Sequence, residues 1–458
     1  MIGRLAVRSL TAHPIRSATL AAGFGAGVAV MAILLGVAEV VLEQSLAPAL
    51  VGGGDVLIRI GTQVPARLLL SGTLQSDALR PRIRVASPSH VGTLFLLHRG
   101  QETRVEARGG IPSLERAIGD EETAALAAWV DRPDDVAWTQ DTPDRVLRHI
   151  DRFHAVPDAP EWSASWAEWL YFNGRSSEAR FYLTFLVGPF QEDGRRAAGV
   201  RLQLDRNGTV HTFGESVPIA EAEALRAPDL TIGASSVRLD GLQYRIHLDL
   251  PGEDGRRVRG DLTIVASPGR LVPPLEITGA RGWRSGYVVP VMSGALDGAL
   301  DVDGDSVSLA GGRGYHDHNW GFWQGVSWQW GQVQQGDLSI LYGRVFPPPD
   351  AADPDRVQGF IGVIGADGPL GYATDVTITE ANDERGQPRT IAIRGRGTAL
   401  DLQVTFDVES AVTSRVGGPL AGGLDFLQLR GEYAVSGRVG DRTLEFTAPG
   451  SAETFRGR

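Results

Sequence analysis

The chain has 458 residues, which is enough for about three domain-sized units at roughly 150 residues per domain. Its 44 lysine and arginine residues against 55 aspartate and glutamate residues give a formal net charge of −11, so no broad nucleic-acid-binding face is expected. The absence of cysteine excludes disulfide frameworks, thiolate metal sites and a cysteine nucleophile.

An uncharged segment near the N-terminus predicts a membrane anchor. A helix over 18–38 would span about 31 Å, close to the hydrocarbon thickness of a bilayer. Charged residues flank the segment, three before it and two after it: Arg4, Arg8, Arg16, Glu39 and Glu43. The positive-inside rule therefore predicts residues 1–16 in the cytoplasm, a transmembrane helix over 17–42, and the rest in the periplasm beside a bacterial inner membrane. A cleaved signal peptide is less favoured, because its apolar core is shorter and no clear A-x-A cleavage site follows.

Small residues on this helix predict close packing against another helix. Gly23 and Gly27 form a G-x-x-x-G pair, which lets a partner transmembrane helix approach closely, although alanine and glycine are also simply common in membrane helices. The segment RLAVRSLTAHPIRSATLAAGFGAGVAVMAILLG resembles the first transmembrane helix of FtsX/MacB-type ABC-transporter permeases. No further apolar run of spanning length occurs, so we expect an anchor and not a working permease.

The chain after the anchor is predicted to be mainly β. Residues 43–164 suggest a small extracytoplasmic region and linker that contains strands at Thr93–His98 and Glu102–Ala107. From about residue 165, apolar and polar residues alternate, and Asn-Gly and Asp-Gly pairs typical of tight hairpins separate the segments. The pattern predicts a barrel or sandwich in two lobes, over 165–285 and 286–458.

The residues most suited to chemistry lie in 311–332, which read GGRGYHDHNWGFWQGVSWQWGQ. In a strand, Tyr315 and Asp317 would share one face, and His316 and His318 would share the opposite face. Burial against aromatic rings raises the pKa of a carboxyl group, which would keep Asp317 protonated and able to protonate an apolar alkene. Ring faces would then stabilise a passing carbocation. The rings available for this are Trp320, Trp323, Trp328 and Trp330.

Two other interpretations of this segment stay open. Aromatic strands also pack barrel cores, and a buried His-Asp-His sequence can form a structural hydrogen-bond network. A metal site would need a distant carboxylate or histidine that the sequence does not identify. We therefore expect no metal.

Two motifs in this order, EWLYFNG (168–174) and GYHDHNWG (314–321), resemble the paired signatures of the lipocalin-like carotenoid 1,2-hydratase (hydroxyneurosporene synthase) and AttH family. Tocopherol cyclases are more distant relatives. The resemblance covers roughly 165–450 and implies two lipocalin-like β-barrels. It also implies a cofactor-independent reaction, in which a terminal double bond is protonated and water captures the tertiary carbocation.

The resemblance assigns roles to individual residues. It implies that Asp317 is the proton donor with Tyr315 as its neighbour, and that His316 and His318 orient or recharge the acid. It adds Trp283 to Trp320 as a cation-stabilising ring. The first motif contributes residues with an expected structural role: Trp169, Tyr171 and Asn173.

Three functions are consistent with these features. The first is a membrane-anchored protein that binds, and hydrates, carotenoids or other long isoprenoids from the bilayer, through an apolar tunnel that reaches Asp317. The second is a non-catalytic accessory subunit of a bacterial membrane complex, such as a photosynthetic reaction-centre/light-harvesting complex, with that tunnel filled by side chains and the anchor packed on a partner helix. The third is an AttH-like partner of an ABC exporter.

Overall fold

The computed structural model describes residues 79–98, 101–120, 142–252, 254–416 and 424–457, together with isolated positions before residue 142. The chain divides into two compact units, one formed by 1–59 and 84–136 and the other by 60–83 and 137–458. The region that we expected over 43–164 is therefore split between them, and its last part belongs to the same unit as the barrels.

The anchor predicted over 17–42, with Gly23 and Gly27, lies outside the described residues apart from a few isolated positions. Within the part of the chain that the structure describes, no helix combines the length and apolar character needed to cross a membrane.

The first unit contains a hairpin and a short helix. Strands β1 (Ser89–His98) and β2 (Gln101–Gly110) pair antiparallel, which confirms the two strands expected there. Helix α4 (Pro112–Ala117) follows, and the buried Glu115 accepts a hydrogen bond from Ser87 at 2.8 Å and pairs with Arg108. These contacts hold the helix against the base of its own hairpin.

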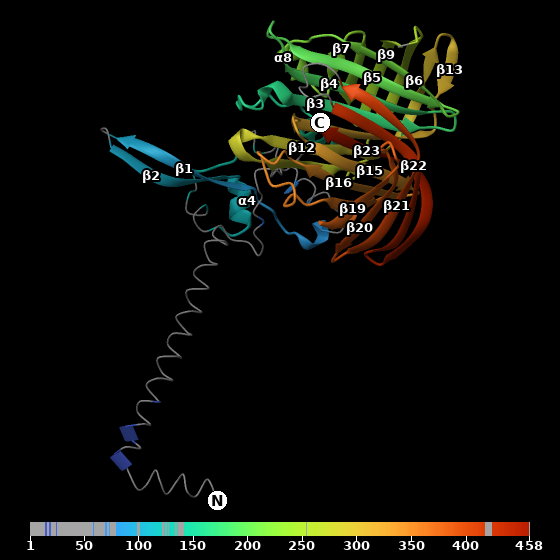
Figure 1. The fold of residues 1–458 in the computed structure, drawn as a ribbon. Coiled ribbons are helices and arrows are strands. Elements are labelled where there is room, and N and C mark those ends of the chain that lie inside the picture. Colours follow the sequence, from blue (N-terminus) through green and yellow to red (C-terminus); the bar gives the residue numbers. More distant parts are fainter. Residues whose placement is uncertain are drawn as a thin grey trace, which may run out of the picture. The chain divides into compact units, whose positions relative to one another are not determined.

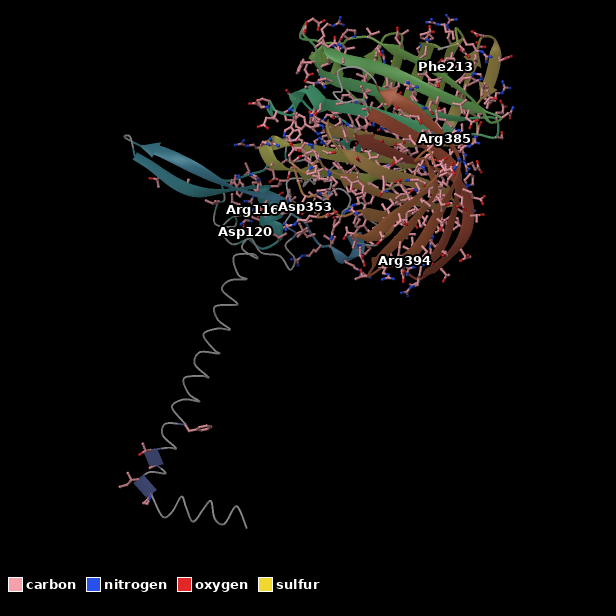
Figure 2. The ribbon with its side chains drawn as sticks, viewed as in Figure 1. Arg116, Asp120, Phe213, Asp353, Arg385 and Arg394 are labelled. Atoms are coloured by element: carbon pink, nitrogen blue, oxygen red, sulfur yellow. The ribbon has the colours of Figure 1, made fainter. Side chains whose placement is uncertain are left out.

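The second unit contains two large antiparallel sheets, drawn next to each other in green to yellow and in orange to red (Figure 1). The first sheet has 12 strands, in the order β6-β5-β4-β3-β14-β12-β10-β9-β8-β7 with β11 and β13 paired to β12. An isolated bridge between Phe213 of β6 and Gly252, the residue after β9, brings the first strand of this order next to β9 and gives the sheet a barrel-like form (Figure 2 labels Phe213). The strands are β3 (Trp166–Arg175), β4 (Arg180–Phe190), β5 (Arg196–Arg206), β6 (Thr209–Ser216), β7 (Leu230–Ile232), β8 (Ser235–Asp240), β9 (Gln243–Pro251), β10 (Arg257–Val265), β11 (Val272–Thr278), β12 (Arg284–Val302), β13 (Asp305–Ser308) and β14 (Gly312–Phe322).

The second sheet has nine strands, in the order β18-β17-β16-β15-β23-β22-β21-β20-β19. Arg394 on β20 marks this sheet in Figure 2. The strands are β15 (Ser327–Gln335), β16 (Leu338–Phe346), β17 (Phe360–Gly365), β18 (Gly368–Ala373), β19 (Asp375–Asn382), β20 (Pro388–Gly397), β21 (Leu400–Val416), β22 (Leu424–Val439) and β23 (Arg442–Gly457). The helical elements of this unit are η1 (Arg80–Arg82), α7 (Pro143–Ile150), η2 (Ser163–Ser165), α8 (Glu221–Ala224) and η3 (Ala280–Gly282).

The mainly β prediction is confirmed, and the strands of the second unit form two sheets, which divide at a different residue from the two lobes that we expected. We expected the second lobe to begin at residue 286, whereas β12, β13 and β14 all belong to the first sheet and the second sheet begins with β15 at Ser327. The reason is pairing: β14 lies between β3 and β12, although more than 130 residues of chain separate it from β3. Alternation along a strand does not reveal such a long-range partner.

Turn chemistry explains the hairpins. Asn207 and Gly208, between β5 and β6, both have positive φ angles of 54° and 80°, as a two-residue hairpin turn requires. Asp303 and Gly304 do the same between β12 and β13. One core cluster fills the first sheet and continues into Trp328, Trp330 and Val345 of the second sheet, so aromatic side chains occupy the boundary between the two sheets.

Candidate active site

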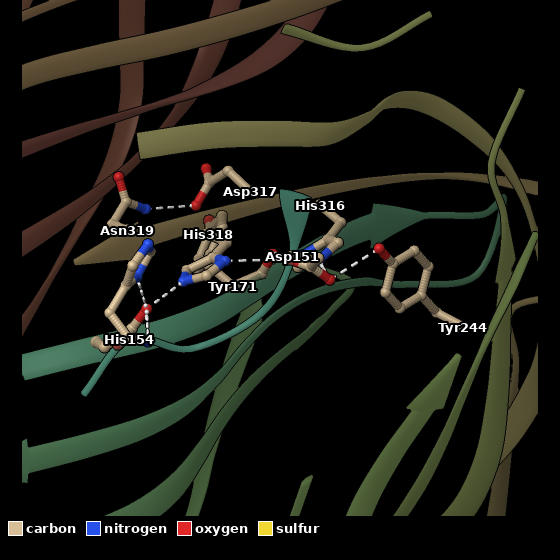
Figure 3. A network of polar contacts seen from close by, with 9 residues as sticks. Asp151, His154, Tyr171, Tyr244, His316, Asp317, His318 and Asn319 are labelled. Carbon is tan, nitrogen blue, oxygen red and sulfur yellow. Dashed lines mark hydrogen bonds and ion pairs between the residues drawn. The ribbon is translucent and has the colours of Figure 1, made fainter. Parts of the chain in front are cut away.

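Strand β14 carries two separate polar networks, one on each face. Its residues from Gly314 to Phe322 are all buried, because β3 and β12 flank it and side chains cover both faces. Asp317 lies across from Tyr171 of β3, and the next residue, His318, lies across from Leu170. Figure 3 shows Asp317 pointing to one side of the strand and His318 to the other. The expected separation of the acid from the histidines by alternation is confirmed.

Asp317 is held by neighbours on its own strand and on the second sheet. Asn319 Nδ2 donates to Asp317 Oδ1 at 2.7 Å, and the Tyr315 hydroxyl also hydrogen-bonds to the carboxyl group. Trp330 Nε1 of β15 in turn donates to the Tyr315 hydroxyl at 3.0 Å. The aspartate is only 1% exposed, so these side chains replace water as its hydrogen-bonding partners.

A second carboxyl group, Glu453, faces the same place from β23 of the second sheet. Burial, followed by the charge of Glu453, raises the pKa of Asp317 well above its usual 3.8. Burial raises the pKa of Glu453 to about 7, although hydrogen bonds from Tyr171 and Gln428 partly oppose this shift. The pKa of Asp317 is therefore shifted toward the neutral acid, and Glu453 is the carboxyl group whose pKa lies near neutrality.

Both carboxyl groups line a small cavity of about 10 Å³. This volume holds about one water molecule. The lining residues are Ser285, Gly286, Tyr287, Asp317, Asn319, Trp323, Trp328, Trp330, Val345 and Glu453. The first of our hypotheses expected an apolar tunnel to Asp317. The described cavity beside Asp317 is far smaller than such a tunnel, and aromatic side chains make up much of its lining.

The tryptophans divide into two groups. Trp323, Trp328 and Trp330 line the cavity, and the ring of Trp169 packs 4.7 Å from Trp323 and 5.5 Å from Trp328.

Trp320 and Trp283 lie elsewhere, contrary to the role that the resemblance implied. Trp320 shares the face of His318, packs against that ring at 5.2 Å and donates to Glu276. Trp283 donates to the Phe322 carbonyl oxygen. Alternation explains the displacement of Trp320, because it lies an odd number of residues from Asp317.

The polar residues of the first motif connect the two sheets. The Tyr171 hydroxyl donates to Gln428 Oε1 on β22 at 3.0 Å, and Asn173 Nδ2 lies 3.5 Å from the same hydroxyl. Gln332 Nε2 on β15 donates to Asn173 Oδ1 at 3.3 Å. Since Tyr171 and Gln428 also bond to Glu453, this network extends to the cavity.

On the opposite face, His318 lies between two buried carboxylates. Its Nδ1 contacts Asp151 at 3.1 Å, just after α7, and its Nε2 contacts Glu168 of β3 at 2.8 Å. Burial alone would lower the pKa of His318, but hydrogen bonds to both carboxylates raise it to about 9. His318 is therefore a buried imidazolium at pH 7, paired on both sides.

Asp151 is the centre of this second network. His316 Nε2 lies 3.0 Å from it and the Tyr244 hydroxyl donates to it at 2.8 Å, while His316 Nδ1 donates to the Tyr171 carbonyl oxygen. Burial alone would raise the pKa of Asp151, but the charge and hydrogen bond of His316 and the bond of His318 lower it to about 2. Both histidines are thus committed to partners other than Asp317. The role that the resemblance implied for them, to orient or recharge the acid, stays a prediction, and in this structure their hydrogen bonds go to other partners.

Three groups lie close enough together to hold a metal ion. Ligand atoms of His154, Glu168 and His318 lie within 4.8 Å of one another. However, His154 Nδ1 and His318 Nε2 both contact Glu168 directly, at 2.7 and 2.8 Å, and the other nitrogen of His318 is bonded to Asp151. These hydrogen bonds explain the cluster, so we assign it as a polar network.

Several site residues were missed in the sequence. Glu168 begins the first motif and could have been found, because alternation places it on the face opposite Trp169 and Tyr171. Asp151 follows a short helix in a linker, and Glu453 lies in the last strand, where neither position has a local signal. The long-range pairing of β14 with β3 brings Glu168 to the site, and that of β15 with β23 brings Glu453. Asp151 reaches it from the end of α7 through its contacts with His316 and His318.

Comparison with known proteins gives weak similarities. No protein-family model matches the chain, and no curated sequence matches it. Among solved structures, kievitone hydratase from Nectria haematococca has a TM-score of 0.44 and 14% identity, covering 67% of this chain and 95% of that one. CghA with Sch210972 has a TM-score of 0.40 and 14% identity, covering 69% of this chain and 95% of that one. A structure described as an AttH protein from Nitrosomonas europaea also has a TM-score of 0.40 and 14% identity, covering 67% of this chain and 98% of that one. Similarities this low say nothing about activity.

Proposed function

We propose that this protein is a hydratase-like acid catalyst that needs no cofactor and acts on a carbon–carbon double bond of a carotenoid or other long isoprenoid. The observation that carries the proposal is a buried carboxylic acid, Asp317, whose pKa is raised well above its usual value beside a cavity that three tryptophans line. A neutral acid in an apolar enclosure can protonate an alkene, which is too weak a base to react with water at this pH.

The residues around Asp317 suit this reaction. Its O–H proton passes to the less substituted alkene carbon, and the positive charge develops on the more substituted carbon. The faces of Trp323, Trp328 and Trp330 stabilise that charge through their quadrupoles. Tyr315, held by Trp330, keeps the carboxyl group aimed at the cavity. Water then adds to the cation, and the product is a tertiary alcohol.

Substrate entry requires movement of the aromatic side chains. A cavity of about 10 Å³ cannot contain an isoprenoid end group, so the rings that fill it must swing aside when a substrate enters. Such motion is a normal part of ligand binding by closed sites.

The experiment compares the wild type with Asp317→Asn on lycopene in detergent micelles. The proposal predicts an alcohol heavier by one water in the wild type and none in the variant, with melting temperatures alike. Asp407→Asn, an exposed position on β21, is the matched control and keeps full activity. Equal yields from the wild type and Asp317→Asn would contradict the proposal.

A second candidate is the non-catalytic accessory subunit of a bacterial membrane complex, of which a photosynthetic complex is one instance. The filled cavity favours it, since this hypothesis expects side chains in place of a tunnel. The AttH-like partner of an ABC exporter is a third candidate, favoured only by the permease-like N-terminus. Purification of the full chain from gently solubilised membranes distinguishes them by the partner that co-purifies: pigment–protein, exporter, or none.

Membrane attachment is part of the proposal. The uncharged segment 18–38 and the arginines before it support an anchor with the barrels on the periplasmic side. Membrane lipid is then the first partner, and a substrate drawn from the bilayer is the simplest source of an isoprenoid. Alkaline carbonate extraction of host membranes tests this: an anchored protein stays in the membrane pellet, and a peripheral one is released.

A further inference from the structure

We propose that Glu453 is a second catalytic residue, the base that takes a proton from the water that attacks the carbocation. This inference rests on the proposed hydration and names the group that completes it. No feature of the two sequence motifs points to Glu453, since it lies in the last strand of the chain.

The placement of Glu453 is the first argument. Asp317 reaches the cavity from β14 of the first sheet, whereas Glu453 reaches it from β23 of the second sheet. Glu453 lies across from Trp330 on one side and from Gln428 on the other, so paired strands hold it in register. The cavity between the two carboxyl groups has room for about one water. Asp317 and Glu453 thus line the same cavity from strands of different sheets.

The difference between the two environments is the second argument. Asp317 is bonded to Tyr315 and Asn319, while Glu453 is bonded to Tyr171 and Gln428. Two buried carboxyl groups that repel each other do not both ionise readily, so the pair holds one proton over a range of pH. Burial raises the pKa of both groups, that of Glu453 to about 7, so Glu453 is able to accept a proton near neutrality.

The reaction balances with these two groups. Asp317 gives its proton to the alkene carbon and becomes a carboxylate. The oxygen of water bonds to the cationic carbon, and one water proton passes to the Glu453 carboxylate. The proton then returns from Glu453 to Asp317 across the cavity they share. The sum is alkene plus water to alcohol, and both groups regain their starting state.

Deuterium labelling separates this role from that of Asp317. Wild type, Asp317→Asn, Glu453→Gln and the control Glu445→Gln, an exposed position on the same strand, are incubated with lycopene micelles in D₂O. Reversible protonation of the alkene leaves deuterium in recovered lycopene, whereas hydration gives the alcohol. We expect Glu453→Gln to lose at least about 100-fold in alcohol formation while deuterium still enters the substrate, because Asp317 remains. Asp317→Asn loses both signals, and Glu445→Gln loses neither.

Each outcome is decisive. Alcohol formation by Glu453→Gln at the wild-type rate would overturn the inference and leave the proposed function standing. Loss of both signals in Glu453→Gln, with melting temperature retained, would show that Glu453 acts before water attack and would overturn the role as base. Neither alcohol nor deuterium with the wild type would overturn the proposed function itself. The infrared band of protonated Asp317 gives an independent check. Because the charge of Glu453 raises the pKa of Asp317, this band should titrate at lower pH in Glu453→Gln than in the wild type. An unchanged titration would contradict the proximity of the two groups.

Discussion

Asp317 and His318 are consecutive in the chain, but their side chains belong to networks on opposite faces of β14. Burial raises the pKa of Asp317, which faces the second sheet, whereas His318 is charged and is paired with Asp151 and Glu168 on the opposite face of β14. One strand therefore separates the hydrogen bonds of a charged network from those of the acid that we propose to be catalytic.

The network around Asp151 is expected to carry stability. Asp151→Asn removes a buried anion that balances His316 and His318, so the free energy of unfolding should fall by about 3–5 kcal/mol. Denaturation in urea at pH 7 measures it. Asp261→Asn is the matched control, because Asp261 and His247 form a similar pair at 2.9 Å that is largely exposed, and little change is expected there. An equal effect in both variants would refute the buried network.

Stability should also depend on pH through the same groups. The folded pKa of Asp151 is about 2, below its usual 3.8, so its contribution is present above pH 3.8 and is lost as the pH falls toward 2. The folded pKa of His318 is about 9, above its usual 6.5, so its contribution is present below pH 6.5 and is lost as the pH rises to 9. Melting temperatures across this range measure both losses, and a flat profile from pH 6.5 to 9 would contradict the charge assigned to His318.

Glu453 should lower the stability of the folded state as the pH rises, whereas Asp151 lowers it as the pH falls. Its folded pKa is about 7, above its usual 4.5, so the folded state loses stability as the pH rises from 4.5 to 7 and the buried group ionises beside Asp317, Tyr171 and Gln428. Glu453→Gln removes the ionisation. We expect the variant to gain melting temperature relative to the wild type between pH 4.5 and 7. A constant difference over this range would show that Glu453 does not titrate there.

The sequence predicted the mainly β architecture and part of the polar arrangement around β14. Alternation was enough for the two β lobes and for the opposite faces of Asp317 and His318, because both depend on neighbours in the chain. The partners of these residues come from distant strands: Glu168 from β3, Asp151 from the end of α7 and Glu453 from β23. Their pairing depends on the register of strands more than 100 residues apart, which no local pattern specifies.

The resemblance that the two motifs suggested was more detailed than the structure supports. It named Trp320 and Trp283 as rings near the acid, but those side chains donate to Glu276 and to the Phe322 carbonyl oxygen. Of the four tryptophans that cluster in this segment, Trp323, Trp328 and Trp330 line the cavity and Trp320 does not.

The filled cavity makes a prediction about ligand binding. Trp328→Ala should open space beside Asp317 and increase the binding of lycopene, at a cost of about 3–5 kcal/mol in stability. Trp166→Ala is the matched control: Trp166 is fully buried and packs 5.0 Å from Phe322, but does not line the cavity. It should lose stability to a similar degree without a gain in binding. Quenching of tryptophan fluorescence by lycopene measures the affinity, and equal binding by both variants would contradict the site.

The contact between Tyr315 and Trp330 should matter to both stability and catalysis. Tyr315→Phe leaves the buried Trp330 Nε1 without its acceptor and Asp317 without one partner, so we expect a loss of about 1–3 kcal/mol together with slower alcohol formation. Trp330→Phe removes the donor, and the double variant should cost less than the sum of the two single changes. Strict additivity would show that the two side chains do not interact.

The measurement that tests the account most directly is the hydration of lycopene by the full-length chain and by Asp317→Asn, read by mass spectrometry with melting temperature recorded on the same samples. The account predicts an alcohol from the wild type, a loss of about 100-fold or more in the variant, and unchanged folding. An inactive wild type, or a variant as active as the wild type, would contradict the catalytic role of Asp317 and would favour an accessory subunit whose barrels no longer turn over a substrate.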